Sequence, residues 1–234
     1  MADLNGVVQG IATLLNPSGV AIVEAPYVKE LIERTEFDTI YHEHLCYFSL
    51  TALDKLFRRH GLTISNVETV AIHGGTLRVF ATPTAANVKV SEAVTAMLAN
   101  EKAWGVGKPA AYREFSDNVL GIRAKLRTVL GGLKSEGRSV AAYGASAKGS
   151  TLLNYAGIGA ETLDFVVDRS TIKQGWYTPG THLPIFSAEK LLEEMPDYVL
   201  LLTWNFADEI LEQQAEYRAR GGRFVIPIPD VRFV

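Results

Sequence analysis

Four consecutive residues, Tyr41, His42, Glu43 and His44, place a phenol, two imidazoles and a carboxylate in one short stretch with aromatic residues on both sides. The ordinary pKa of histidine lies nearest neutrality, so a neutral imidazole beside a hydroxyl and a carboxylate can accept a proton and be oriented by its partners. On a strand, alternation would send Tyr41 and Glu43 to one face and the histidines to the other, whereas a loop could converge three groups. The cluster predicts an acid–base catalytic site.

Two other interpretations of the cluster compete with catalysis. Taken singly, one histidine is more simply a satisfied core group, the other an exposed one, and Glu43 a surface carboxylate. His42 and His44, two residues apart on a strand, could also share a metal ion. No Cys, His or Asp cluster elsewhere in the chain obviously supplies the remaining ligands. We therefore predict no metal site.

A second candidate site is the turn from Gly144 to Gly149, which follows an apolar run at residues 140–143. Free backbone N–H groups and the helix dipole favour an anion at such a strand-to-helix turn, and Lys148 adds a positive charge. Ser146 stands where a dinucleotide-binding turn has its second glycine, and Lys148 precedes Gly149, so neither that fingerprint nor a P-loop is present. A tight turn that needs small residues explains the pattern about as well as anion binding.

Further ligand-binding candidates follow later strands. Asp168 lies 24 residues after Gly144, near where an acid that binds a ribose would stand, and suggests a nicotinamide-dependent oxidoreductase as an alternative function. Loops at the carboxyl ends of parallel strands hold ligands. We therefore expect the loop from Trp176 to His182 at the same edge of the sheet as Lys148, while Trp204 is as well explained by packing.

The composition limits the class of protein. Hydrophobic residues make up 47% of the 234 residues and charged residues 21%, which suits two globular domains of roughly 100 residues and excludes disorder. A net charge of −3 gives no general attraction to nucleic acid or to an anionic membrane. The single cysteine, Cys46, excludes an internal disulfide and favours a reducing compartment, the cytoplasm. No apolar run reaches the roughly 20 residues of a membrane span, and no basic start precedes the first apolar residues.

Three segments are expected along the chain. Residues 1–82 combine helices, the first of which Asp3 can cap and a later one Ser49 or Thr51, with strands at 62–70 and 76–81. The apolar run Val20–Ala25 reads as a buried, parallel strand that nothing upstream can pair with. Residues 83–137 read as bridging helices, and residues 138–234, with alternating strands and helices, as a Rossmann-like domain with a parallel sheet.

The chain resembles the nucleotide-sugar C-methyltransferases, which use S-adenosylmethionine to methylate a carbon of a deoxy-ketosugar. The resemblance begins at Phe37–Leu45 and continues through His73–Arg78, Tyr143–Gly149, Lys173–Gly175, Pro179–His182 and Pro227–Pro229. It implies an α/β fold, with a partial class I methyltransferase sheet (1–82), bridging helices (83–137) and a Rossmann-like C-terminal domain (138–234).

The resemblance also implies roles for individual residues. His44 would be the base that removes a proton next to the keto group, with Tyr41 and Glu43 orienting it or stabilising the enolate. Gly144, Ser146, Lys148 and His182 would hold a nucleotide diphosphate sugar. Members of that family begin with a small zinc-binding domain and carry a Gly-rich loop that binds S-adenosylmethionine. Neither the zinc-binding cysteines nor this loop has a counterpart here, so we expect a missing N-terminal portion or a partner chain. A non-catalytic sugar-nucleotide-binding module is a further alternative.

Overall fold

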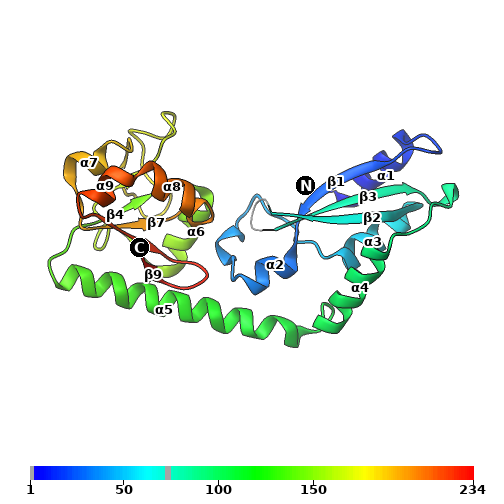
Figure 1. Ribbon diagram of the computed structural model, residues 1–234, viewed down its shortest axis with the longest axis horizontal. Helices are drawn as coiled ribbons and strands as arrows, with labels where there is room; N and C mark the ends of the chain where they lie inside the picture. The colour runs from blue at the N-terminus through cyan, green and yellow to red at the C-terminus, as the bar shows by residue number, and fades with distance from the viewer. Residues whose placement is uncertain (1–2, 72–74) are drawn as a thin grey trace. The chain divides into compact units, whose positions relative to one another are not determined.

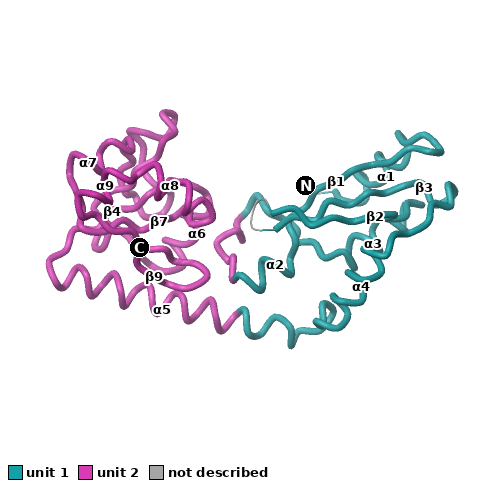
Figure 2. Tube along the Cα trace, viewed as in Figure 1, with its two compact units in different colours: residues 1–34, 42–115 teal, residues 35–41, 116–234 magenta. Residues whose placement is uncertain are grey.

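The computed structural model describes residues 3–71 and 75–234, which form two compact units (Figure 2). Unit 1 comprises residues 1–34 and 42–115, and unit 2 comprises residues 35–41 and 116–234. The helices expected to bridge two domains are not a separate part. Helix α4 (Glu92–Trp104) belongs to unit 1, and all but the first three residues of α5 (Arg113–Ser135) belong to unit 2.

A three-stranded antiparallel sheet in the order β1-β3-β2 organises unit 1 (Figure 1). Its core lies between this sheet and helices α1, α3 and α4, because their apolar side chains form one buried cluster with those of β2 and β3. The remaining elements of unit 1 are α1 (Leu4–Leu14), β1 (Ala21–Pro26), α2 (Val28–Glu33), α3 (Leu50–Arg59), β2 (Leu62–Val70), β3 (Thr76–Pro83), η2 (Thr84–Ala86) and η3 (Pro109–Tyr112).

Local signals of the sequence account for most elements of unit 1. The Asp3 carboxylate accepts the Gly6 N–H at 2.8 Å and caps α1, and the Ser49 hydroxyl accepts the Ala52 N–H at 3.1 Å and caps α3. Strands β2 and β3 pair as the predicted antiparallel hairpin, with a bulge between Ile64 and Asn66. His73 and Gly74, in the expected turn, lie outside the described residues.

The prediction of a buried, parallel strand at Val20–Ala25 is wrong. Strand β1 pairs antiparallel with β3, and within the described residues it stands at the edge of the sheet. Ile22 is 61% exposed, and among the hydrophobic residues of β1 only Ala25 is buried. An apolar run does not specify the direction of its partner, and here the partner is the return strand of a hairpin.

Unit 2 contains a six-stranded sheet in the order β6-β5-β4-β7-β8-β9, parallel except for the edge strand β9. This confirms the α/β class and the parallel sheet predicted for the C-terminal part. Its elements besides α5 are η1 (Phe37–Thr39), β4 (Val140–Tyr143), α6 (Ala147–Ala156), β5 (Val166–Val167), β6 (Ile185–Phe186), α7 (Lys190–Glu194), β7 (Tyr198–Leu201), η4 (Trp204–Phe206), α8 (Ala207–Gln213), α9 (Ala215–Ala219), β8 (Arg223–Ile226) and β9 (Arg232–Phe233).

Several features of unit 2 were not predicted. Strands β6 and β9 span two residues each, which is too short for a pattern of alternation. The helix expected from Phe206 to Arg220 is divided at Gln214 into α8 and α9. Helix α6 starts at Ala147, before the expected Ser150, because the Ser146 hydroxyl caps it.

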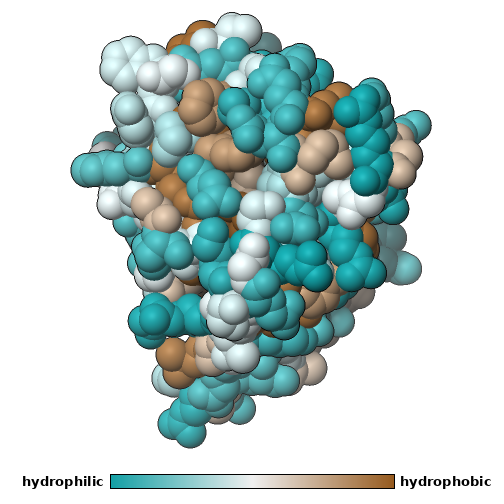
Figure 3. Space-filling view, turned by 90° about the vertical axis from the view of Figure 1, so that its left-hand side faces the viewer, coloured by the Kyte–Doolittle hydropathy of each residue, from teal (hydrophilic) through white to brown (hydrophobic). Residues whose placement is uncertain are grey.

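The surface of unit 2 offers no large apolar face on the side shown in Figure 3, where hydrophobic residues appear in small groups between hydrophilic ones. Across residues 3–71 and 75–234, we find no helix with the length and apolar character that crossing a membrane requires.

Candidate functional site

The Tyr-His-Glu-His stretch lies in turns and irregular chain between η1 and α3, so the alternation of a strand does not apply to it. Tyr41 and His44 are half-buried, whereas His42 and Glu43 are exposed. Tyr41 belongs to unit 2, and the chain returns to unit 1 at His42. His44 is thus partly sheltered from water, and Glu43 is a solvated carboxylate.

The segment before Tyr41 is anchored in unit 2 by Asp38, a residue that sequence reasoning did not single out. Asp38 is 0% exposed, and the indole N–H of Trp204 donates to its Oδ2 at 2.7 Å. Within the described residues its Oδ1 has no hydrogen-bond partner. Burial raises the pKa of Asp38, and the hydrogen bond from Trp204 and the charge of Lys148 oppose this shift only in part.

Trp204 also links Asp38 to the predicted anion-binding residue. The Lys148 ammonium lies over the Trp204 ring, 5.2 Å from its centroid, a distance at which a cation and an aromatic face attract one another. Trp204 follows β7, and Lys148 is in the first turn of α6, so both lie at the carboxyl ends of parallel strands. The structure therefore gives Trp204 a role beyond packing.

The turn at Gly144 is built tightly. Gly144 has a φ of 98°, and a Cβ there would approach the Thr203 side chain to 2.6 Å, so only glycine fits. The Ala145 N–H donates to Asp168 Oδ2 at 2.7 Å, and the Ser146 hydroxyl accepts the Gly149 N–H at 3.0 Å. Part of the donor set expected to face an anion is therefore already used within the protein.

Asp168 is held by its own neighbours. Besides Ala145, it accepts the Ser170 N–H at 2.8 Å, and the Lys173 ammonium lies 3.2 Å from its Oδ2. Both carboxylate oxygens thus have donors from the protein, so a structural role explains this residue. These contacts give no support to the alternative in which Asp168 binds the ribose of a nicotinamide cofactor.

A hollow of about 260 Å³ opens beside the Gly144 turn, at the carboxyl ends of β4, β5 and β7. In open parallel sheets this is the edge where ligands bind. Arg169 brings a guanidinium to its wall, hydrogen-bonded to Gln213 at 3.1 Å and 3.6 Å from the Glu209 carboxylate. Residues that line the hollow include Tyr143, Gly144, Asp168, Arg169, Thr203 and Phe206.

The structure does not bring His182 to Lys148, so the common edge expected for them is not observed. Tyr177 bridges Pro184 antiparallel, and the loop therefore runs from Tyr177 toward the amino end of the parallel strands. There the Asn154 amide, near the end of α6, donates to the Pro179 carbonyl at 3.0 Å. Lys148 is at the opposite end of the same helix, and His182 is exposed in a left-handed conformation.

The described residues do not form a site that fits S-adenosylmethionine. The sheet of unit 1 is antiparallel, and no parallel strand in it leads through a Gly-rich turn into a helix. The turn at Gly144 offers such a geometry in unit 2, but Ser146 stands where close approach requires glycine, and Asp168 occupies the Ala145 N–H.

No group of three or more His, Cys, Asp or Glu residues suited to a metal occurs in the described part of the chain.

Comparison with known proteins gives the family. A family model described as the C-methyltransferase C-terminal domain matches residues 71–229, more than half of the chain. The chain belongs to this family. It is also 44% identical, over 232 residues, to the C-methyltransferase NovU of Streptomyces niveus. That alignment covers 99% of this chain and 55% of the relative, so the chain spans about half the length of the curated protein it matches.

The raised pKa of Asp38 leads to a prediction on stability. The folded protein keeps a proton on Asp38 at pH values where the unfolded chain has released it. The stabilisation is therefore fully present below the ordinary pKa of the carboxyl, about 3.9, and is lost as the pH rises through the raised value. Asn cannot ionise and keeps an acceptor for Trp204. Asp38→Asn should therefore gain in Tm relative to the wild type as the pH rises above about 4.

Thermal unfolding of both proteins at several pH values measures this trend. Asp230→Asn is a control of opposite sign, because the hydrogen bond from Lys125 lowers the pKa of that exposed carboxyl. The control should lose in Tm relative to the wild type as the pH rises through the lowered pKa of Asp230 toward about 4, and its difference from the wild type should then stay level at higher pH. A Tm difference between Asp38→Asn and the wild type that stays constant with pH would contradict the prediction.

Proposed function

We propose that this chain supplies the proton-abstracting and substrate-binding parts of an S-adenosylmethionine-dependent C-methyltransferase that acts on a nucleotide-linked deoxy-ketosugar. The observation that carries the proposal is the 44% identity to a C-methyltransferase along nearly the whole chain. The loop at Tyr41–His44 lies within the aligned length and carries the groups that this reaction needs.

The chemistry begins at the carbon next to the ketone of the sugar. The carbonyl makes that C–H bond acidic, because the electron pair left behind is delocalised onto the oxygen. In the proposal a neutral His44 imidazole takes the proton and the C–H electron pair forms an enolate, while the Tyr41 hydroxyl donates to the enolate oxygen. Glu43, being exposed, would act by orienting its neighbours. S-adenosylmethionine would supply the methyl group.

The sugar nucleotide would be held in unit 2. Lys148, with Gly144 and Ser146 beside it, would lie near the phosphates, and the adjoining hollow with Arg169 in its wall would take a further part of the nucleotide. A positive side chain and a helix N-terminus at one sheet edge support this placement. His182 stands away from Lys148 and is left out of the proposed phosphate site.

Partners and location complete the proposal. Because the described residues provide no site for S-adenosylmethionine and the curated relative is longer, an additional N-terminal portion or a partner chain would hold that cofactor. We place the enzyme in the cytoplasm, where the exposed thiol of Cys46 would stay reduced.

Proton exchange tests the proposal without the methyl donor. A nucleoside diphosphate-linked deoxy-ketosugar, incubated with the protein in D₂O, should lose its NMR proton signal at one carbon next to the ketone faster than without protein. Exchange at a single carbon is expected, since one base addresses one face of the bound sugar. Tight binding without exchange would favour the non-catalytic binding module, and the absence of both would refute the proposal.

A further inference from the structure

A fully buried carboxylate in unit 1 holds the start of helix α3. Glu101, on α4, is 0% exposed. Its Oε1 accepts the Leu50 N–H at 2.6 Å, and its Oε2 accepts the Thr51 N–H at 2.8 Å and the Thr51 hydroxyl at 2.5 Å. Burying a carboxylate is costly unless donors surround it, and the free N–H groups of a helix N-terminus provide such donors.

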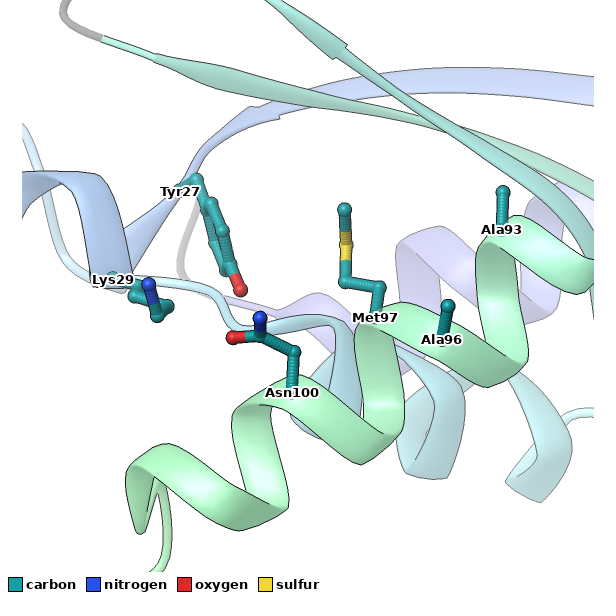
Figure 4. A pocket seen from close by; sticks show the side chains of 6 residues that line it. All are labelled: Tyr27, Lys29, Ala93, Ala96, Met97 and Asn100. Carbon is teal, nitrogen blue, oxygen red and sulfur yellow. The ribbon is translucent and has the colours of Figure 1, made fainter.

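Tyr27 completes the set of donors around Glu101. Burial, with the charge of Glu101 and a hydrogen bond to it as further causes, raises the pKa of Tyr27. The phenol therefore stays protonated as a donor at neutral pH. Figure 4 shows its ring descending from the end of β1 toward α4, beside a hollow of about 320 Å³ that Met97 and Asn100 also line. Glu101 is thus tied to β1 as well as to α3.

The residues that follow β1 also hold the downstream end of the loop that carries His44. The Val28 N–H donates to the Phe48 carbonyl at 2.9 Å, and Tyr27 forms a parallel bridge with Phe48. Two residues further on, the N–H groups of α3 bind Glu101. The backbone is therefore fixed from Phe48 onward, four residues after His44, and the loop between has no regular secondary structure of its own.

We propose that Glu101 is a positioning residue for His44: by fixing the start of α3 it sets where the loop places the imidazole. The inference rests on the proposed function, in which His44 is the base. Glu101 has no exposed surface and touches neither substrate nor cofactor in this role. Its contribution is the geometry of the proton transfer, where a displacement of about 1 Å can cost up to about a hundredfold in rate.

Glu101→Gln tests this role in the full chain, because an amide has one acceptor oxygen where two are needed. Val94→Ala is the matched control: Val94 is a buried residue on the same helix, and its truncation costs stability without removing a hydrogen bond to the N–H groups of α3. Isotope-labelled histidine allows the imidazole signals to be followed by NMR at a fixed pH, and His42→Asn and His44→Asn assign the two signals of the loop. We expect Glu101→Gln to move the imidazole signal of His44, and Val94→Ala to leave it unchanged.

The rate of proton exchange should fall in parallel, by about ten- to a hundredfold for Glu101→Gln, with the affinity for the sugar nucleotide retained. If Glu101→Gln does not fold, Tyr27→Phe and Thr51→Val, which each remove one donor, should move the imidazole signal of His44 by a smaller amount. An unchanged His44 signal in every folded variant overturns the inference. A displaced signal with no exchange in the wild type would instead refute the proposed function and keep the positional link.

Discussion

Replacing His44 by Asn is expected to lower the rate of proton exchange, and kcat in the active methyltransferase, by about two to four powers of ten. Asn retains a polar side chain of similar size but cannot accept the proton, so the chemical step loses its base. Affinity for the nucleotide sugar should remain near that of the wild type, because the proposed phosphate contacts lie in unit 2. The effect should therefore appear in kcat and hardly in substrate binding.

His42→Asn is the matched control for this experiment. His42 lies two residues away in the same loop, is exposed, and has no assigned step in the reaction. Exchange is measured by NMR in D₂O, and affinity by calorimetry with the same ligand. A His44→Asn protein that exchanges at the wild-type rate would remove His44 from the mechanism. Equal losses in both variants would mean that the loop had been disturbed and that the base lies elsewhere.

Lys148→Ala should weaken binding of the nucleotide diphosphate sugar by about 1–3 kcal/mol, a factor of about 5 to 150, the range for losing a charge-assisted hydrogen bond. The ammonium is placed over the Trp204 ring and beside buried Asp38, so its position is set before the ligand arrives. Stability should change little, because Lys148 is only half-buried and its contact with the ring contributes about 0.5–1 kcal/mol.

Lys125→Ala makes the same change of charge elsewhere in unit 2, where Lys125 pairs with Asp230 on the surface, and should leave affinity unchanged. Lys148→Arg should restore part of the affinity, since it returns the charge with a different shape. Calorimetric titration with the sugar nucleotide measures all three. Unchanged affinity in Lys148→Ala would make the Gly144 turn a packing feature, which the contacts of Ala145 and Ser146 would then explain fully.

Short-range chemistry in the sequence determined many of the elements. Asp3 and Ser49 mark helix starts because their side chains bind N–H groups within three residues. The β2–β3 hairpin and strand β4 were found because alternation and short apolar runs are properties of neighbouring residues. The cluster around His44 was found in the same way, since its chemistry stands in four consecutive positions.

Pairings between distant residues were decided only by the tertiary structure. The direction and edge position of β1 depend on β3, whose paired residues are 50 to 60 positions away in the chain. Asp38 and Trp204 are 166 residues apart, and Glu101 meets the start of α3 across about 50, so no periodicity could reveal either contact. Burial then gives these carboxylates their properties, because a charged group removed from water depends on whichever donors the fold brings to it. The sequence by itself determined which groups could do chemistry, and the fold decided which buried residues hold them.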